Sequence, residues 1–438
     1  MDLAASKSAD FLQLGQLALE SKDRPVWLRV GKLIDGVNGK PIQDADLVFN
    51  AKEILFVGNQ PPPELLSPGQ NEPDAVLPDR TILPCLVEAH SHMFLDGAPL
   101  DFLQRKQYLQ QSEDWMLKRA RTRWPKILAT GVGAVRDAGD NRGVGLLLAK
   151  EAKSMLGALS FAPWIDSPGA AIHHRGRYGS FMGEPIEDFE GAEQCVASRV
   201  ACGADRIKLL VSGIINFKAG RVTAPPQMNT SEVAALVDAA RQHGRQTFAH
   251  ASGTEGIENA IEGGVTTVEH GFFVTEDQLS RMRDREIAWV PTFAPVQLQI
   301  DCAREMGWDR QVVDHLRRII TAHQQMLCLG QRLGIKLLAG SDAGSCGVPH
   351  GIGLLRELCH MEHAGMPSID VLRSATSASA STLHFAEKIG RLAPGYRSRM
   401  ILTCHDPLVT VANLQKEKVV LFDGTAVDCD GSMDTDGL

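Results

Sequence analysis

Six side chains suited to metal binding lie at or near the ends of apolar stretches in this sequence: His90, His92, Lys208, His250, His270 and Asp342. Residues two apart on a strand share a face, so His90 and His92 can reach one metal ion together. Imidazole nitrogen and carboxylate oxygen are ligands that suit Zn²⁺ and similar divalent ions. Each residue alone is more often structural, so the prediction of a metal site depends on their common position at strand ends.

Eight apolar, strand-like stretches carry or flank these residues and alternate with amphipathic, helix-like segments. The strands are expected at 82–90, 134–137, 161–166, 206–211, 246–250, 266–270, 288–292 and 336–340. Several are almost continuously apolar, as strands buried on both faces should be. Helices are expected between them, for instance at 230–243, 254–262 and 312–333. This repeat predicts a (β/α)8 TIM-type barrel, in which the carboxyl ends of the strands carry the chemistry.

The two ends of the chain show a different pattern, with short strands and many turn residues. Residues 5–20 have helical spacing, strand-like stretches follow at 26–30, 45–50 and 53–59, and a loop rich in Pro and Gly extends to residue 79. Short strands return at 400–404 and 418–422. We therefore expect an α/β protein in which 1–79, with a leading helix, and 390–438 form one small β-sandwich domain, and 80–389 form the barrel. An open, doubly wound sheet is the alternative, and the regular repeat disfavours it.

The composition excludes several classes of protein. The 438 residues are 44% hydrophobic and 22% charged, and 45 basic against 53 acidic residues give a net charge of −8. This balance offers no electrostatic footprint for nucleic acid or an anionic membrane. No apolar stretch approaches the ~20 residues that a membrane-spanning helix needs, and the N-terminal segment lacks the pattern of a secretory signal. Nine scattered cysteines without a CxxC pair favour a reduced, cytoplasmic setting.

Six segments of the chain resemble the amidohydrolase superfamily, and within it the branch of imidazolonepropionase-like and Xaa-Pro or Xaa-Arg dipeptidase-like enzymes. They are LPCLVEAHSHMFLDG, GVGAVRDAGD, ADRIKLLVSGIINF, TFAHASGTEGIENAIEGGVTTVEHGFF, AGSDAGSCGVPHG and IGRLAPGYRSRMILTCHDPL. The resemblance follows the family order and covers about residues 26–426. It implies a barrel with a small β domain, and hydrolysis of a carbon–nitrogen bond at a metal site.

The resemblance also implies roles for the histidines and the lysine. His90 and His92 stand at the positions of the first metal's ligands, and His250 and His270 at those of the second. Lys208 stands at the bridging position, where such enzymes carry a lysine carboxylated by CO2. A free ammonium there would repel both cations, whereas a carbamate supplies an anionic bridge with two oxygens. We therefore expect two divalent ions, most simply Zn²⁺, with a carboxylated Lys208 between them.

Asp342 stands at the position of the catalytic aspartate, which is also a metal ligand in the family pattern. Two ions about 3.5–4 Å apart can lower the pKa of a shared water molecule and polarise the scissile carbonyl. Asp342 would then accept the proton of the nucleophile and later deliver it to the leaving nitrogen. One carboxylate with these two roles is what the cleavage of an amide requires.

The candidate substrate-binding residues lie in two loops, with His173, His174, Arg175, Arg177 and Tyr178 after the expected third strand and His350 after Asp342. Two arginines and a tyrosine can form a fork for a carboxylate, the group with which a dipeptide or an N-acyl amino acid ends. A solvated loop beside a pocket for a neutral substrate is the alternative. The stretch after the expected fourth strand lacks the tyrosine that the family pattern would offer to the substrate carbonyl.

The sequence favours hydrolysis of an amide-type bond in an N-acyl amino acid, a dipeptide or a related small amide. The alternatives are hydrolysis of a neutral urea, carbamate or cyclic amide, deamination of a heterocycle, and a scaffold without chemistry. Deaminases of this superfamily usually carry Glu three residues after the fifth-strand histidine, where this chain has Gly253. A scaffold is expected to lack a ligand, and none is missing from the sequence. We expect a small-molecule substrate, no nucleic-acid or membrane partner, and a homo-oligomer.

Overall fold

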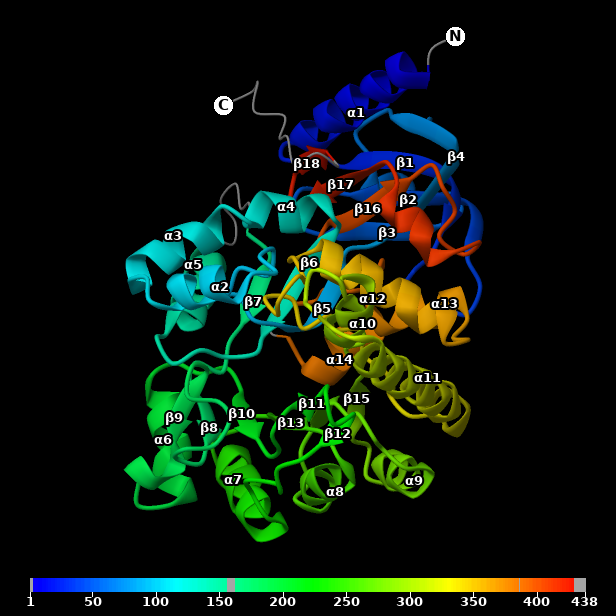
Figure 1. The fold of residues 1–438 in the computed structure, drawn as a ribbon. Coiled ribbons are helices and arrows are strands. Elements are labelled where there is room, and N and C mark those ends of the chain that lie inside the picture. The colour runs from blue at the N-terminus through cyan, green and yellow to red at the C-terminus, as the bar shows by residue number, and fades with distance from the viewer. Residues whose placement is uncertain (1–2, 156–161, 386, 429–438) are drawn as a thin grey trace.

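The computed structural model describes residues 3–155, 162–385 and 387–428 of the chain. Figure 1 shows helix α1 (Leu3–Glu20) next to a sheet that both ends of the chain build, with the remaining strands and most helices on the other side of that sheet. Residue 161, the first of the expected third strand, and residues 429–438 lie outside the described ranges. Within those ranges, no helix combines the length and the apolar character that crossing a membrane requires.

The two ends of the chain pair in one seven-stranded sheet. Its strands are β1 (Val26–Leu33), β2 (Ile42–Phe49), β3 (Ile54–Gly58), β4 (Ala75–Pro84), β16 (Arg399–Thr403), β17 (Lys418–Phe422) and β18 (Thr425–Asp428). Their order is β18-β17-β16-β4-β1-β2-β3. Strands β1 and β4 are parallel, and the other neighbours are antiparallel. The pairing of β4 with β16 joins the N-terminal segment to the C-terminal one, as the sequence predicts.

Two parallel sheets hold the strands expected in the barrel. The first has the order β5-β6-β7, made of β5 (Leu86–Ser91), β6 (Val132–Asp137) and β7 (Trp164–Asp166). The second has the order β15-β14-β13-β10-β8-β9, made of β8 (Ala171–His173), β9 (Gly183–Pro185), β10 (Ile207–Leu210), β13 (Thr247–Ala251), β14 (Thr267–His270) and β15 (Ala288–Val290). Every residue of β5, β6, β10, β13 and β14 is buried, which accounts for their apolar character.

Backbone contacts join these two sheets on both sides. The eighth expected strand, 336–340, belongs to neither sheet, but it forms an isolated parallel bridge with β15. The same segment meets β5, where the Ala89 amide donates to the Ala339 carbonyl at 2.9 Å. On the other side, the Asp205 amide before β10 donates to the Ser167 carbonyl after β7 at 2.8 Å. Seven of the eight expected strands thus contain a regular strand, although the first, 82–90, is divided between β4 and β5. The eighth spans the gap between the free edges of β15 and β5.

The structure adds short strands that the sequence does not predict. Strand β8 lies in the stretch expected to be a polar loop, and it pairs with β10 through Ile172 and Leu209. Both residues are fully buried. A second addition is the hairpin of β11 (Ile215–Asn216) and β12 (Arg221–Val222). Strands of two or three residues are too short to produce a periodic hydrophobic pattern, so sequence periodicity misses them.

Helices pack around the strands, and their main members agree with the expected ones. They are α2 (Phe102–Leu109), α3 (Glu113–Arg121), α4 (Trp124–Ala129), α5 (Val144–Ser154), α6 (Ala192–Ala201), α7 (Thr230–Gln242), α8 (Thr254–Glu262), α9 (Glu276–Asp284), α10 (Ala294–Asp301), α11 (Arg310–Leu333), α12 (Ile352–His363), α13 (Ser368–Ser374) and α14 (Ser377–Leu383), with the 3-10 turns η1 (Pro63–Leu65), η2 (Ile186–Asp188) and η3 (Val411–Gln415). Helices α7, α8 and α11 correspond to the expected 230–243, 254–262 and 312–333. Asn229 and Thr275 begin α7 and α9 with capping boxes.

Candidate metal centre

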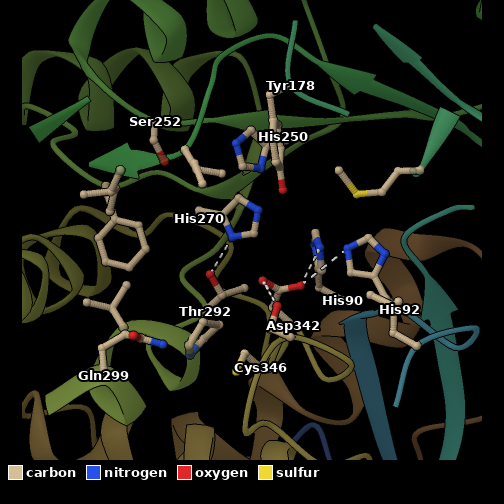
Figure 2. A pocket seen from close by; sticks show the side chains of 18 of the residues that line it. His90, His92, Tyr178, His250, Ser252, His270, Thr292, Gln299, Asp342 and Cys346 are labelled. Carbon is tan, nitrogen blue, oxygen red and sulfur yellow. Dashed lines mark hydrogen bonds and ion pairs between the residues drawn. The ribbon is translucent and has the colours of Figure 1, made fainter. Parts of the chain in front are cut away.

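The six side chains expected to bind metal lie together at one end of the strands. They come from the end of β5 (His90, His92), from β10 (Lys208), β13 (His250) and β14 (His270), and from the loop after residue 340 (Asp342). Figure 2 shows the four histidines and the aspartate around one central space. The histidines and the lysine are each at most 8% exposed. The fold therefore brings together residues that are up to 252 positions apart in the sequence.

His90, His92 and Asp342 form the tightest group within this cluster. Asp342 Oδ1 lies 3.6 Å from His90 Nε2 and 3.5 Å from His92 Nε2. Tetrahedral ligands about 2.0–2.1 Å from a Zn²⁺ ion lie about 3.4 Å apart, so these atoms have nearly the required spacing. The ring of His270 lies 5.0 Å from that of His90 and 4.5 Å from that of His250, measured between centroids. The rings of His250 and His270 thus lie next to the group formed by His90, His92 and Asp342.

Three polar atoms of the cluster are buried and have no hydrogen-bond partner among the described residues: His90 Nε2, Lys208 Nζ and Asp342 Oδ1. An unpaired buried polar atom costs about 1–3 kcal/mol, and more if it is charged. Such atoms in a folded protein require an explanation, and a bound ion is one. The Lys208 amine lies instead over the Phe248 ring, 4.6 Å from its centroid. The donor set therefore fits cations at its centre.

Burial gives these groups the protonation states that metal binding requires. It lowers the pKa of all four imidazoles, to about 3 for His92 and His250, so each ring is neutral at pH 7. Neutral imidazole is the form that ligates metal. Burial also lowers the pKa of Lys208 to about 8 and raises that of Asp342 to about 6. A substantial fraction of the lysine is thus a neutral amine at slightly alkaline pH, and the aspartate is anionic at pH 7.

A buried ion pair holds His90 in its orientation. Glu269 Oε2 lies 2.5 Å from His90 Nδ1, and both oxygens of this carboxylate accept from Arg136 Nη2 at 2.8 Å. Thr267 donates a further hydrogen bond to Glu269. This pair is not among the residues predicted from the sequence, although a glutamate and an arginine inside otherwise apolar strands are a signal of a buried ion pair. The pair directs Nε2 of His90 toward the central space, as partners of metal-binding histidines do.

His92 and His270 are oriented through their Nδ1 atoms in the same way. His92 Nδ1 lies 3.2 Å from the Gly139 carbonyl oxygen, and His270 Nδ1 lies 2.7 Å from the Thr292 hydroxyl. A carbonyl accepts only, so His92 carries its proton on Nδ1 and has Nε2 free as a ligand. His250 differs, because its Nε2 lies 3.3 Å from the Gly213 carbonyl. Three of the four rings therefore present Nε2, and His250 is the exception.

The backbone at the cluster takes conformations that most residues avoid. His270 and Asp342 have positive φ angles of 66° and 54°. Outliers of this kind cost about 1–3 kcal/mol and are retained where the surrounding structure imposes them. The Trp289 indole donates to the His270 carbonyl at 2.9 Å. Gly344, at φ 95°, lets the loop after Asp342 approach β5, since a Cβ atom there would lie 2.6 Å from the carbonyl oxygen of His92.

A cavity of about 380 Å³ opens from the cluster. Its wall is mainly apolar and comprises Leu95, Phe181, Met182, Leu210, Ile214, Ile215, Phe217, Phe272, Pro295, Val296 and Trp308. Arg105 of α2 and Tyr178 also line it. Figure 2 shows the Tyr178 ring beside His250, and the two ring centroids are 5.3 Å apart. The cavity thus combines a polar floor with walls that suit a mostly apolar molecule.

In the structure, Tyr178 lies apart from the two arginines with which it was predicted to bind a carboxylate. Arg175 pairs with Asp188 at the surface and is 62% exposed, and Arg177 donates to the Pro225 carbonyl at 2.5 Å. His174 lies between Glu187 and Glu232. These three side chains lie outside the cavity lining because nearby acids and carbonyl oxygens bind them.

Two further histidines predicted to contact substrate also lie behind the cavity wall. His173 is buried, and its Nδ1 lies 2.8 Å from the His174 carbonyl oxygen. His350 Nε2 lies 3.1 Å from the His92 carbonyl oxygen, so it supports the peptide that carries a metal-ligand candidate. Of the six residues predicted to bind substrate, Tyr178 alone lines the cavity described here. Substrate contact by the other five stays a prediction, which their placement does not support.

We expect Glu269→Gln to weaken divalent-ion binding by about 10–100-fold, because outer partners of metal-ligating histidines contribute that much. The amide keeps the shape of the side chain but loses the charge that faces His90 and Arg136. The measurement is the Kd for Zn²⁺ after chelation, with a thermal melt to verify folding. Glu258→Gln, which alters a surface pair with Arg281, is the control. Equal Zn²⁺ affinity in both variants and the wild type would contradict the role of Glu269.

Comparison with known proteins agrees with this geometry. The model of the amidohydrolase family matches residues 81–427. A curated relative, the ochratoxinase of Aspergillus niger, is 23% identical over 441 residues, covering 93% of this chain and 88% of its own. The crystal structure of a Xaa-Pro dipeptidase with methionine bound in its active site superposes with a TM-score of 0.75 at 24% identity, over 92% of this chain and all of the other.

The crystal structure of the A. niger ochratoxinase gives a TM-score of 0.74 at 21% identity, over 92% of this chain and 96% of the other. These identities establish a shared fold, and the family match, which covers most of the chain, establishes the family. This chain belongs to the amidohydrolase family and is a metal-dependent hydrolase of amide-type carbon–nitrogen bonds.

Proposed function

We propose that this protein hydrolyses N-acyl amino acids, dipeptides or related small amides, with two divalent ions held by the six-residue cluster. The observation that carries the proposal is the set of buried, unpartnered atoms of His90, Lys208 and Asp342 at the floor of an apolar cavity. Cations would satisfy these atoms, and the apolar wall would accept the side chain or acyl group of a substrate. The named activities of the ochratoxinase and dipeptidase relatives are compatible with such a substrate.

The ligands divide into two groups by their separations. His90, His92 and Asp342 would hold the first ion, and His250 and His270 would bind the second. Zn²⁺ suits this mixture of imidazole and carboxylate ligands. When bound, such ions lower the pKa of a water molecule and polarise the carbonyl that it attacks. The protein's own contribution is to present neutral rings in fixed orientations and to exclude bulk water from the cavity floor.

Lys208 would bridge the two groups as a carbamate. Its amine has no hydrogen-bond partner among the described residues and is 1% exposed. Carbamate formation joins the neutral amine nitrogen to the carbon of CO2 and releases one proton. Burial favours the neutral amine by lowering the pKa of Lys208 to about 8. The product replaces a group that would repel cations with an anion that binds them.

Asp342 would move the proton during hydrolysis. Its Oδ1 faces His90 of β5 and His92 just after that strand, while Oδ2 accepts from the Ser345 hydroxyl at 2.9 Å. The carboxylate accepts the proton that the attacking water loses, and it then donates that proton to the nitrogen as the carbon–nitrogen bond breaks. Without this transfer the leaving group would depart as an unstable amide anion.

The proposal also covers the closure of the barrel, the domain boundaries, the location of the protein and its partners. The two parallel sheets and segment 336–340 would close as an eight-stranded barrel, with the terminal sheet as the sandwich-like small domain. The expected boundaries are 79/80 and 389/390, and the first of them falls inside β4, whose last residues also belong to the terminal sheet. The described cysteines are free thiols, which supports a cytoplasmic location. We also propose a homo-oligomer that acts on small molecules and has neither nucleic acid nor membrane as a partner.

The direct test is a substrate panel on protein stripped of metal and reloaded with Zn²⁺. The panel contains N-acyl amino acids with aromatic acyl groups, dipeptides, aryl ureas and lactams. We expect zinc-dependent hydrolysis of the first two classes, with stripped protein as the control. Hydrolysis confined to the ureas or lactams would favour the neutral-substrate alternative. No zinc-dependent hydrolysis of any amide would contradict the proposed function.

Asp342→Asn should reduce kcat by about 10²–10⁴-fold, because an amide cannot accept the proton. The substitution keeps the shape of the side chain, so the protein should fold normally. Asp96→Asn is a suitable control, since Asp96 pairs with Arg119 and lies outside the cavity lining. The measurement is single-turnover hydrolysis of the best panel substrate. Retention of most of the wild-type rate would show that the reaction needs no such base.

A further inference from the structure

The cavity contains one guanidinium, and the function described so far does not use it. Arg105 lies on α2, the first helix after β5, and lines the cavity together with the metal-ligand candidates. Lys208 and Arg105 are the lysine and arginine side chains of this lining. Lys208 belongs to the metal cluster at the floor. Arg105 is therefore the cation that remains available to a substrate.

Two features hold Arg105 beside the cavity: the capped helix that carries its backbone, and a hydrogen bond made by its guanidinium. Asp101 is the residue just before α2, and its side chain caps the helix by accepting from the amides of Leu103 and Gln104. The guanidinium Nη1 donates to the Gly344 carbonyl at 2.9 Å. Gly344 lies two residues after Asp342, so the loop that carries the catalytic aspartate also fixes the guanidinium. Arg105 is half-buried, which leaves part of its guanidinium free to bind another partner.

That other partner is not a protein carboxylate. Within the described part of the chain, Arg105 makes no ion pair, whereas Arg119 in the next helix pairs with Asp96. The acidic residue of the cavity lining is Asp342, which the metal cluster uses. The charge of Arg105 opposes the rise in pKa that burial causes at both Asp342 and Tyr178. Asp342 nevertheless makes no ion pair with Arg105, and a cation in a mainly apolar cavity that has no ion-pair partner among the described residues favours an anionic ligand.

We infer that Arg105 binds a carboxylate of the substrate, and that the enzyme prefers amides with a free carboxylate beside the scissile bond. This inference rests on the proposed function and names its substrate class. The amide would lie at the metal cluster, the carboxylate at Arg105, and the apolar group against Phe217 and Trp308. Arg175 and Arg177, which the sequence suggested for this role, face away from the cavity.

The test compares an N-acyl amino acid with the same compound as its neutral carboxamide. Arg105→Met should lower kcat/KM for the acid at least tenfold, mainly through KM, because charge-assisted hydrogen bonds are among the strongest. The carboxamide should change less than twofold. Arg105→Lys should restore part of the preference for the acid, since it keeps the charge but loses the fork. Lys106→Met, which removes the neighbouring exposed cation, should leave both substrates unchanged.

A binding measurement separates this inference from the proposed function. In an Asp342→Asn background, calorimetry gives the Kd of the N-acyl amino acid with and without Arg105→Met. A rise of tenfold or more supports the carboxylate site even if turnover is too slow to follow. An unchanged Kd, or equal losses for the acid and the carboxamide, would overturn the inference. A wild-type protein that binds the acid through Arg105 but hydrolyses no amide would contradict the proposed function alone.

Discussion

The polar atoms buried at the floor of the cavity determine how the rest of the structure must be arranged. A neutral imidazole, a lysine amine and a carboxylate oxygen face a common space, and none of them has a hydrogen-bond partner among the described residues. Each would lower the stability of the fold if it stayed unpaired. Divalent cations would remove that cost, because nitrogen and oxygen lone pairs would then become ligands. The amine is the one group of the three that cations would repel, and the proposed conversion of Lys208 to a carbamate would resolve the conflict.

Side chains and backbone groups around this floor keep the metal-ligand candidates in place. The pair of Arg136 and Glu269 is buried behind His90, and the Gly139 carbonyl and the Thr292 hydroxyl hold His92 and His270. His270, at the end of β14, and Asp342, in the loop after residue 340, have positive φ angles that help to direct their side chains into the same space. The apolar wall then separates this charged centre from solvent. The proposed binding, proton transfer and exclusion of water would therefore all depend on one set of strand ends and the loop that carries Asp342.

Much of this arrangement is predictable from the sequence because strands buried on both faces leave a strong signal. The apolar stretches ending at His90, His250 and His270 indicated both the strands and the side chains that the fold brings together, and α8 was predicted with its observed bounds. Residues 336–340 also looked like a strand, but they pair through isolated contacts that apolar composition cannot distinguish from a regular ladder.

Loop geometry explains most of what the sequence could not predict. Arg175 and Arg177 follow an unpredicted strand, β8, and carboxylates or carbonyls distant in sequence turn them outward. The sequence did not indicate Arg105 as a binding residue, because a single arginine on a polar helix resembles any solvent-exposed arginine. Glu269 was overlooked because it precedes a stronger candidate, His270. In each case the decisive fact is a partner far along the chain.

Native mass spectrometry of the intact protein, prepared with Zn²⁺ and bicarbonate, tests the central claim most directly. We expect two zinc ions per chain and an added mass of one CO2, with that addition located on Lys208 and absent from Lys208→Ala. The variant should also lose zinc. A wild-type chain that holds two zinc ions with an unmodified Lys208, or a Lys208→Ala chain that retains both ions, would show that no carbamate bridges the ions.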